Sequence, residues 1–383
     1  MKVNKYLPFA FIYFFVNSLA LPFGLTYTAL LAPLFYIWIL IVRKKEILLP
    51  FLAVLFPFII IQLTLVGVDT KSYFLSLLNF VLVYVFCQAA YTFLLVCKDV
   101  EKIFRNILIL NFIFCLVAIP FYFTPYFEPL WTDTNIAADV GKYRRLQLFT
   151  YEPSYYALLF SPFFFYYLLQ YCFRQNTISA KWLLPMLFLP YVLSFSFGVI
   201  GAAILAGVLL WIIYFKRLTR KRRILNALIY TGAGFASTMV ILILFFRQNP
   251  VFLRIKNIFS GEDSSGNGRV TDAFILANKL LAKKNEYWGV GIGQIKIMGE
   301  DTIRSYYLYY TDFTVAIPNA VAETLAIFGW IGVSLRLAIE VFLFFHTRVW
   351  KNYYRLLLFL FIFIYQFTGS YITNVAEYFI WIL

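Results

Sequence analysis

The stretch GVIGAAILAGVLLWIIYF, residues 198–215, contains no charged residue. A transmembrane helix needs about 20 apolar residues, and runs of this kind recur along the whole chain. Of the 383 residues, 62% are hydrophobic and 13% are charged, whereas a typical soluble domain is about 25% charged. The sequence therefore predicts an integral membrane protein with little room for a soluble domain.

Apolar runs of sufficient length divide the chain into about eleven predicted spans. They lie at about 7–22, 25–42, 47–67, 73–97, 107–123, 155–173, 182–196, 198–215, 224–246, 320–345 and 356–373, with 374–383 as a short candidate for a twelfth. The first run follows the basic start MKVNK without a small-residue cleavage site, so we interpret it as a retained helix. The expected fold is all-α, a polytopic bundle of about 11–12 transmembrane helices in one membrane domain, residues 1–383.

Lysine and arginine indicate the orientation of this bundle. With a cytoplasmic N-terminus, the short inner loops hold 19 of the 33 lysine and arginine residues, including RKKE at 43–46 and KRLTRKRR at 216–223. Short loops decide orientation in the positive-inside rule, so this assignment is favoured. Topology thereby accounts for the net charge of +15, and no nucleic-acid partner is expected. The four cysteines show no CxxC pairing, so neither a disulfide framework nor a zinc site is expected.

Acidic residues concentrate on the outer side, where two loops carry nearly all of the polar chemistry. The first outer loop runs from about 124 to 154 and the second from about 247 to 319. The second is far longer than a helix bundle requires, and long loops tend to be functional or disordered. We therefore expect any active site to lie on the outer, extracytoplasmic side.

Within the second outer loop, residues 267–285 predict an amphipathic helix that lies on the membrane surface or covers a cavity. Its predicted apolar face consists of Val270, Phe274, Ala277 and Leu281. The following GVGIG, residues 289–293, is interpreted as a tight turn, because it lacks the spacing of a nucleotide-binding loop.

Two adjacent arginines precede the sixth predicted span in RRLQLFTYEPS, residues 144–154. Arg144 and Arg145 lie on the outer side, where the inward bias of basic residues makes them unexpected. A guanidinium presents a planar fork of donors that matches phosphate oxygens, so a phosphate or pyrophosphate headgroup is the predicted ligand. Glu152 would orient an arginine or accept a proton. Interfacial anchoring of the helix is the alternative interpretation, and it remains open.

A further arginine, Arg269, lies near the start of the predicted amphipathic helix. Its neighbours Gly266 and Gly268 would let an anion approach the backbone closely at a helix N-terminus. Ordinary surface charge is the alternative interpretation. Two outer loops could then supply one arginine each to a single lipid-linked anion.

The span predicted at 320–345 carries two pairs of polar residues at helical spacing. Asn319 and Glu323 share one face at its outer end. An ionisable residue at membrane depth indicates function, although an interfacial position would also account for Glu323. Arg336 and Glu340 lie deeper and predict an internal salt bridge.

Aromatic residues and the single histidine complete the list of candidates. Tyrosines suited to stacking against sugar faces are Tyr306, Tyr307, Tyr309 and Tyr310. An interfacial aromatic belt is the alternative interpretation of these residues. His346, the only histidine, falls on the cytoplasmic side, so chemistry at an outer site would run without histidine.

In their order and membrane side, these motifs resemble the O-antigen polymerase and ligase superfamily, most of all the Wzy-type polysaccharide polymerases. The resemblance rests on Arg145 followed seven residues later by EPS, on the long outer loop with GNGR and GVGIG, and on the re-entry PNAVAETLAIFGWIG. These motifs cover only about 145–154 and 266–332. The glycine often seen between the first family arginine and EPS is replaced here by Leu148.

The resemblance implies a bundle of the GT-C type that transfers an undecaprenyl-pyrophosphate-linked glycan at the outer face of the bacterial cytoplasmic membrane, without a metal or cofactor. Arg145 and Arg269 would neutralise the pyrophosphate leaving group. Glu152 or Glu323 would activate the acceptor hydroxyl, and both remain candidates. Expected substrate contacts are Arg144, Asn319, Tyr306, Tyr307 and Tyr310. A chain-length regulator and a flippase of the same pathway are implied partners, beside the lipid bilayer.

Three other functions are considered at this point: a flippase, a ligase and a polyprenyl-phosphate-sugar transferase. A flippase for the same lipid-linked oligosaccharide should distribute polar groups near mid-membrane, whereas here they cluster outside. Ligases of the superfamily typically use an outer-loop histidine, which this chain lacks. A polyprenyl-phosphate-sugar transferase would place acidic residues in the first outer loop of the bundle, where LALPFGL has none. The expectation is therefore a polymerase.

Overall fold

The computed structural model describes residues 14, 27–44, 46–135, 142–175, 177–218, 256–257, 260, 264–307 and 315–382. The spans predicted at 224–246 and, apart from Phe14, at 7–22 lie outside the described residues. The chain divides into two compact units. Unit 1 consists of residues 1–15, 101–267 and 352–361, and unit 2 of residues 16–100, 268–351 and 362–383.

The described part of unit 1 contains helices α5 to α9 and a two-stranded hairpin. Their bounds are α5 Val100–Phe121, β1 Trp131–Asn135, β2 Lys142–Leu146, α6 Pro153–Phe173, α7 Ala180–Ser194, α8 Phe197–Ile213 and α9 Phe215–Leu218. The regular elements among the described residues of unit 2 are all helices. Its elements are α2 Tyr27–Arg43, α3 Leu48–Thr64, α4 Thr70–Val96, α12 Ser264–Leu281, α13 Ile295–Tyr306, α14 Ala320–His346, η3 Val349–Lys351 and α16 Val375–Ile382, and α15 Tyr353–Tyr365 belongs in part to each unit.

Four of the described helices are long and apolar enough to cross a membrane. They are α4, α5, α6 and α14, and shorter apolar helices are α2, α3, α7, α8 and α15. The prediction of a predominantly helical membrane protein is thereby confirmed for the described residues. The helix in the predicted run 356–373 is shorter than expected, because α15 ends at Tyr365, and α16, Val375–Ile382, corresponds to the short candidate at 374–383.

Helix α6 forms the centre of unit 1 and is buried along most of its length. It packs against α7, α8 and β2. The ring of Phe164 stacks on Tyr191 of α7 with 4.6 Å between centroids, and the Tyr191 hydroxyl lies 2.7 Å from Ser161 Oγ. Aromatic stacking and a satisfied hydroxyl pair thus join α6 to α7 where neither polar group has access to water.

The loop expected at about 124–154 contains a short two-stranded hairpin, which adds to the otherwise helical described residues. Strands β1 and β2 pair antiparallel, with Trp131 opposite Leu146. Both of these side chains are buried, and Trp131 Nε1 donates to Ala118 O at the end of α5 at 2.8 Å. The hairpin is therefore attached to the membrane helices by one apolar pair and one indole hydrogen bond.

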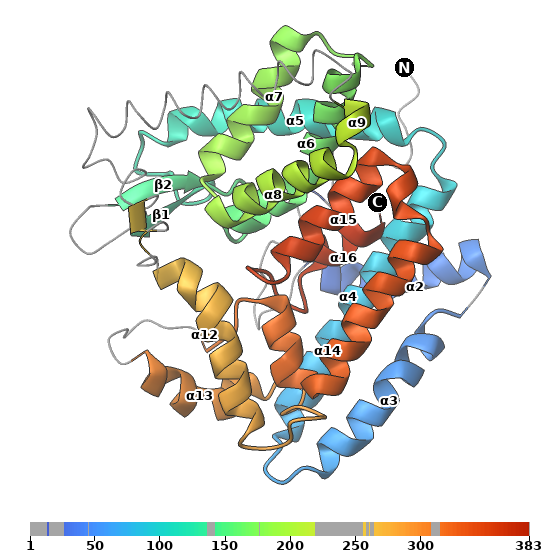
Figure 1. Cartoon of the computed structure of the whole chain (residues 1–383), viewed down its shortest axis with the longest axis vertical. Helices are drawn as coiled ribbons and strands as arrows, with labels where there is room; N and C mark the ends of the chain where they lie inside the picture. The colour runs from blue at the N-terminus through green and yellow to red at the C-terminus, as the bar shows by residue number, and fades with distance from the viewer. Residues whose placement is uncertain are drawn as a thin grey trace. The chain divides into compact units, whose positions relative to one another are not determined.

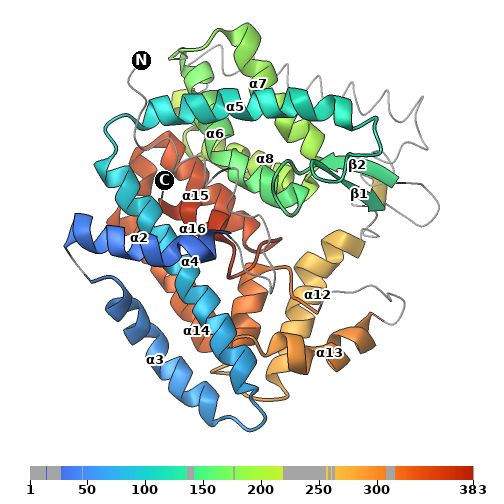
Figure 2. The ribbon, with the colours of Figure 1, turned by 180° about the vertical axis from the view of Figure 1, so that it is seen from behind.

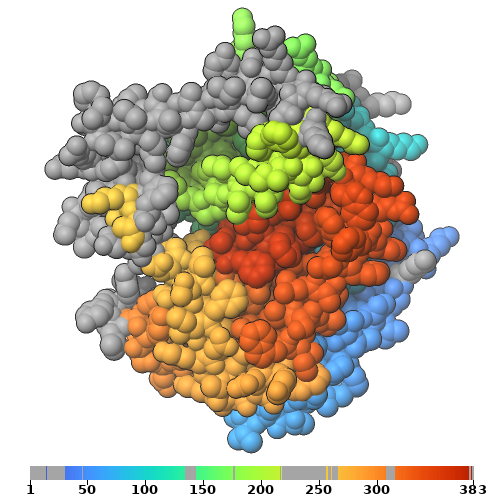
Figure 3. All heavy atoms as spheres, viewed as in Figure 1, coloured from blue at the N-terminus to red at the C-terminus, as the bar shows by residue number. Residues whose placement is uncertain are grey.

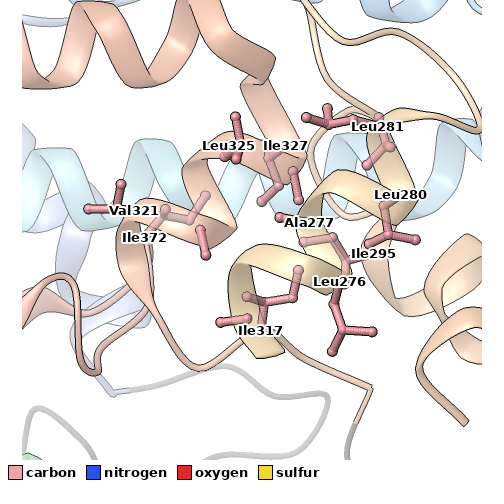
Figure 4. Packing of buried hydrophobic residues seen from close by; sticks show 14 of the residues in the cluster. Leu276, Ala277, Leu280, Leu281, Ile295, Ile317, Val321, Leu325, Ile327 and Ile372 are labelled. Carbon is pink, nitrogen blue, oxygen red and sulfur yellow. The ribbon is translucent and has the colours of Figure 1, made fainter. Parts of the chain in front are cut away.

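Unit 2 is built around α4. Helix α2 crosses α4, and α16 also packs against it, as Figures 1 and 2 show from opposite sides. Figure 4 shows the main apolar cluster, in which side chains of α12, α13 and α14 meet; members include Leu276, Leu280, Ile295, Val321, Leu325 and Ile327. In Figure 3 the light orange atoms of α12 adjoin the darker orange atoms of the following segments without a visible gap.

The buried face of α12 differs partly from the predicted one. Ala277 and Leu281 are buried as expected, and Phe274 packs at the edge of the cluster. Val270 is instead 46% exposed, and Ala273 and Leu276 occupy the core. The buried face of α12 is therefore rotated about the helix axis relative to the predicted face. The apolar residues of this segment would fit either of two adjacent helix faces.

Helix α14 is interrupted at Gly329, where φ is 66° and ψ is −167°. Only glycine adopts this region readily. The turn after α12 inserts at the break through backbone hydrogen bonds in both directions. The four bonds run from Val290 N to Ala326 O, Gly291 N to Ile327 O, Trp330 N to Glu286 O and Ile331 N to Tyr287 O, at 2.9, 3.1, 3.0 and 3.2 Å. The turn thereby supplies hydrogen-bond partners for the backbone N–H and C=O groups that lose their helical partners at the break.

The two segments of α14 fold against each other at this break. Arg336 Nη1 donates to Thr324 Oγ1 at 3.1 Å, although residues twelve apart in a straight helix are separated by about 18 Å. The span expected at 320–345 is therefore present as one of the four candidate membrane helices, but it is interrupted at Gly329 and is not continuous. Residues 320–328 form a short half-helix that returns alongside the longer segment 330–346 (Figure 1).

The half-helix also changes the expected location of Glu323. Its neighbour Thr324 lies at the level of Arg336, within the second segment, and not at the far end of one long helix. The expectation that Asn319 and Glu323 lie at the outer end of a continuous span is corrected accordingly.

Two glutamines attach this arrangement to α3 and α4. Gln62 of α3 is fully buried, and its Nε2 donates to Trp288 O and Ile327 O, each at 2.8 Å. Gln294 exchanges two hydrogen bonds with the backbone of Asp69, which caps the start of α4. Asp69 accepts from Ser72 N, which lowers the pKa of its carboxyl below the usual value. The turn at 285–294 is thus bonded to three helices.

We expect Gly329→Ala to destabilise the protein by about 3 kcal/mol or more, because an added Cβ would lie 2.3 Å from Tyr287 C and the backbone conformation excludes other residues. Thermal unfolding in detergent would measure the loss. Gly207→Ala, in α8, is the matched control, since no atom lies within 4 Å of its added Cβ. Equal unfolding temperatures for the two variants would contradict the structural role of the break.

Candidate functional site

The hairpin separates Arg144 from Arg145. In β2, Arg144 lies opposite Asp133 and Arg145 lies opposite Thr132. Successive side chains of a strand point to opposite faces, so the two guanidinium groups cannot serve as one adjacent pair. Each arginine therefore has to be considered separately.

Arg144 contacts the end of α5 and the loop that follows it. Its guanidinium carbon lies 3.6 Å from the ring centroid of Phe127 and 5.5 Å from that of Tyr122. It donates to Tyr122 O through Nη1 and pairs with Asp133 at 3.4 Å. These contacts stabilise the hairpin itself, which favours a structural role over the expected substrate contact.

Arg145 lies at the C-terminal end of α7, where its Nε donates to Ser194 O at 3.0 Å. This helix end is terminated by Phe195 in the left-handed conformation. Cations are favoured at helix C-termini, because the last carbonyl groups carry partial negative charge. The contact orients the guanidinium of Arg145 against a fixed backbone group.

Glu152 begins α6 as its N-cap residue. One of its carboxylate oxygens accepts from Ser154 Oγ, and its backbone carbonyl accepts from Thr150 Oγ1 at 2.9 Å. Both contacts are local, and neither reaches Arg145. Pro153 occupies the first helical position, where its missing N–H is tolerated. The described contacts of Glu152 are those of a helix start.

The turn between Arg145 and Glu152 contains a residue in an unusual conformation. Leu148 has a φ of 48°, in the left-handed region that favours glycine, and its side chain is 1% exposed. Its N–H donates to Leu130 O at 3.1 Å. Leu148 therefore adopts the turn conformation that glycine would adopt more easily. Burial of its side chain offsets the unfavourable backbone conformation.

In unit 2, Arg269 and Asn319 are in contact. The side-chain amide of Asn319 donates to Arg269 O at 2.7 Å and to Phe367 O at 2.6 Å, and its Oδ1 accepts from Ala322 N at 2.9 Å. Asn319 is fully buried. One asparagine thus caps the half-helix of α14 and attaches α12 to it, so Arg269 is held beside the start of the half-helix.

The N-terminus of the half-helix does not itself offer its first amides to an anion. Those of Ala320, Val321 and Ala322 donate to Gly369 O, Gln366 O and Asn319 Oδ1 at 3.1, 3.3 and 2.9 Å. Anion sites at helix ends require N–H groups that point at the ligand. Positive charge at this place would therefore have to come from the guanidinium of Arg269.

Glu323 lies one turn after Asn319 but does not bond to its side chain. Its Oε2 accepts from Ile372 N at 2.6 Å. The carboxylate thereby fixes the segment that precedes α16, and its side chain remains partly exposed. A carboxylate held by a single backbone N–H retains capacity to accept a proton or a further hydrogen bond.

Tyr306 and Tyr307 clamp α13 to α12. Their hydroxyl groups donate to the two oxygens of Asp272, at 2.9 and 3.1 Å. The ammonium of Lys279 lies 4.6 Å from the ring centroid of Tyr306. Hydrogen bonding to Asp272, followed by burial, raises the pKa of the Tyr306 phenol. The expected sugar-stacking role is not shown by these contacts, and Tyr309 and Tyr310 lie outside the described residues.

The structure brings together Arg269, Asn319 and the tyrosine clamp in unit 2, while Arg145 and Glu152 belong to unit 1. An added Cβ at Gly268 would lie 3.4 Å from the Tyr307 hydroxyl, so the clamp packs directly beside Arg269. Asp272 was missed at the sequence level. Its position three residues after Arg269, on the same helix face, was the available signal.

No protein-family model matches this chain, and no curated protein matches it significantly. Among the described residues, no group of three or more histidine, cysteine, aspartate or glutamate side chains could hold a metal ion.

We expect Asp272→Ala to destabilise the α12 and α13 pair by about 2 kcal/mol, because it removes the acceptor of two phenol hydrogen bonds. Denaturant unfolding at neutral pH would measure the loss. Since the pKa of Tyr306 is raised above 10.0 in the folded state, this stabilisation is complete below pH 10 and disappears as the pH rises through the raised pKa.

Glu300→Ala is the control for Asp272→Ala, because Glu300 also lies in this region but forms an exposed pair with Arg304. Its removal should change stability by no more than about 0.5 kcal/mol. A loss at Asp272→Ala that persisted unchanged well above pH 10 would contradict the phenol contribution.

Proposed function

We propose that this chain is a polysaccharide polymerase that joins undecaprenyl-pyrophosphate-linked repeat units at the outer face of the cytoplasmic membrane, in a bundle of the GT-C type. The contact between Asn319 and Arg269 O carries this proposal. It attaches an arginine, the side chain best suited to bidentate recognition of phosphate, to a buried half-helix that also carries a carboxylate.

The proposed reaction transfers the growing glycan from its lipid carrier to the acceptor. The acceptor hydroxyl oxygen forms a bond to the anomeric carbon of the donor glycan while the bond from that carbon to the pyrophosphate oxygen breaks. The hydroxyl proton passes to a carboxylate, and the lipid pyrophosphate leaves with the electron pair. Arginine side chains stabilise the negative charge that develops on the leaving oxygen.

Glu323 is the better supported of the two proposed bases. It lies one turn from Asn319, which contacts Arg269, and one of its oxygens has a single backbone donor at 2.6 Å. Glu152 instead bonds locally to Ser154 at the start of α6. Arg145 is retained as a second candidate for phosphate binding, because its contact with Ser194 holds the guanidinium in a fixed orientation.

We expect Arg269→Ala and Arg145→Ala each to reduce polymer formation by about 10²-fold or more, as removal of a charge-stabilising donor does in other group transfers. The measurement is the length of surface polysaccharide in cells that express equal amounts of inserted protein. Arg304→Ala is the matched control, because Arg304 lies in the same loop but is 56% exposed and paired with Glu300. Long polymer in both the Arg145 and the Arg269 variants would overturn the proposal.

A deletion strain would distinguish the polymerase from a flippase of the same pathway. Loss of a polymerase should leave single lipid-linked repeat units on the outer leaflet, whereas loss of a flippase should leave them on the inner leaflet. Labelling of intact spheroplasts with a lectin would show which leaflet carries the repeat units, because the lectin reaches only the outer leaflet. Accumulation on the inner leaflet would favour transport over transfer.

A further inference from the structure

The connection between α15 and α16, residues 366–374, lies against the start of the half-helix of α14 in unit 2. Three of its backbone carbonyl groups accept hydrogen bonds from that start. The bonds run from Asn319 Nδ2 to Phe367 O, Ala320 N to Gly369 O and Val321 N to Gln366 O, at 2.6, 3.1 and 3.3 Å. The half-helix and the connection are therefore held together by backbone groups as well as by side chains.

The first residue of this connection is fixed by a buried ionic network. Gln366 is fully buried, its Oε1 accepts from Arg336 Nε at 2.9 Å, and its Nε2 donates to Glu340 Oε2 at 2.8 Å. Arg336 bonds to Glu340 at 3.2 Å, which confirms the predicted salt bridge, and also to Glu377 of α16. Removing one partner of a buried ion pair is strongly destabilising. This end of the connection is therefore firmly attached to the second segment of α14.

Further along, the connection contacts Glu323, the better supported of the two proposed bases. Ile372 N donates to Glu323 Oε2 at 2.6 Å, which is the one hydrogen bond of this carboxylate among the described residues. A general base has to lie within hydrogen-bond reach of the proton that it accepts. The direction of the carboxylate of Glu323 therefore depends on where the backbone of Ile372 lies.

Tyr378 of α16 holds the backbone of Ile372. Its hydroxyl donates to Ile372 O at 2.8 Å. The side chain of Ile372 is 3% exposed and belongs to the apolar cluster in Figure 4. Apolar packing is non-directional, whereas a hydrogen bond to a carbonyl group has a preferred geometry. The phenol is itself held by a capped helix, because Asn374 Oδ1 accepts from Ala376 N at 3.0 Å at the start of α16.

We propose that Tyr378 is a positioning residue, which orients the carboxylate of Glu323 through the backbone of Ile372. The inference rests on the proposed role of Glu323 as the base. Two hydrogen bonds carry it, from the phenol to Ile372 O and from Ile372 N to Glu323 Oε2. Catalytic groups lose activity when they are displaced by as little as 1 Å, so a contact that fixes Ile372 contributes to the rate although it does not touch the substrate.

Tyr378→Phe tests the inference, because it removes the hydroxyl and keeps the ring. The full-length protein in liposomes would be supplied with undecaprenyl-pyrophosphate-linked repeat units isolated from a deletion strain, and initial rates of polymer formation would be measured. We expect kcat to fall about tenfold while KM stays unchanged, since positioning of the base acts on the transition state and not on substrate binding. Unchanged kcat in Tyr378→Phe would overturn the inference.

Tyr84→Phe is the matched control. Tyr84 also donates its hydroxyl to a backbone carbonyl, Ile47 O at the start of α3, at 3.0 Å. Its loss removes the same kind of hydrogen bond without changing a contact of Glu323, so kcat and KM should both stay at the wild-type values. A tenfold loss of kcat in Tyr84→Phe as well would show that any such bond matters equally, which would contradict a specific role of Tyr378.

The double variant of Tyr378→Phe and Glu323→Gln separates positioning from a general structural effect. Glu323→Gln alone should lower kcat by about 10²-fold or more, as loss of a general base does. Because Tyr378 acts through Glu323, adding Tyr378→Phe should lower kcat no further. An equal tenfold loss from Tyr378→Phe in both backgrounds would overturn the inference.

These measurements distinguish failure of the inference from failure of the proposed function. Wild-type turnover in Glu323→Gln would overturn the role of Glu323 as the base, and the inference with it. An inactive Glu323→Gln beside a fully active Tyr378→Phe would overturn the inference alone.

Amide hydrogen exchange gives a readout that does not depend on polymer formation. The amides of residues 366–374 should exchange faster in Tyr378→Phe than in the wild type and at the wild-type rate in Tyr84→Phe, because only the first variant releases Ile372 O. Unchanged exchange in Tyr378→Phe would contradict the role of the phenol in holding this connection.

Discussion

Backbone hydrogen bonds between the turn at 285–291 and the break at Gly329 are the constraint on which the described arrangement of unit 2 depends. A helix cannot be interrupted inside an apolar bundle unless other groups satisfy the N–H and C=O groups that it releases. The turn supplies these partners from its own backbone, and Gln62 adds its side-chain amide to Ile327 O. Because the break is stabilised in this way, the half-helix can return beside the longer segment of α14 and bring Asn319 to Arg269.

Hydrophobic runs were sufficient to predict a helical membrane protein, because a long apolar segment by itself indicates that it lies in lipid and not in water. The break in α14 could not be predicted in the same way. GVGIG was correctly expected to turn, and Gly289, Gly291 and Gly293 all have positive φ. The sequence contains no sign, however, that this turn pairs with Ala326 and Ile327 about forty residues later. Such pairing follows from tertiary structure, and an unbroken apolar run hides it.

The candidate site was predictable to a similar extent. Its arginines stand out because positive charge in loops that are expected on the outer side opposes the general bias of the chain. The role of each arginine depends on tertiary contacts, which the spacing of residues along the sequence does not reveal. Arg144 and Arg145 look like a pair, yet the strand directs them to opposite faces, with one on Phe127 and the other on Ser194. Leu148 illustrates the same limit, because its positive φ is stabilised by burial of its side chain and by the hydrogen bond that its N–H donates to Leu130 O.

Arg145 and Arg269 share a mode of attachment that bears on the proposed chemistry. Each is tied to a helix terminus, Arg145 through its own side chain and Arg269 through its backbone carbonyl. Arginine loses about 2 kcal/mol of rotamer entropy when it is fully ordered. Partial ordering before the substrate binds reduces what binding must then supply. For Arg145 the Nε contact restricts the side chain directly, whereas the described contact of Arg269 holds its backbone carbonyl. Each arginine is thus held at its own helix terminus, where a donor to the leaving group needs less ordering when charge develops.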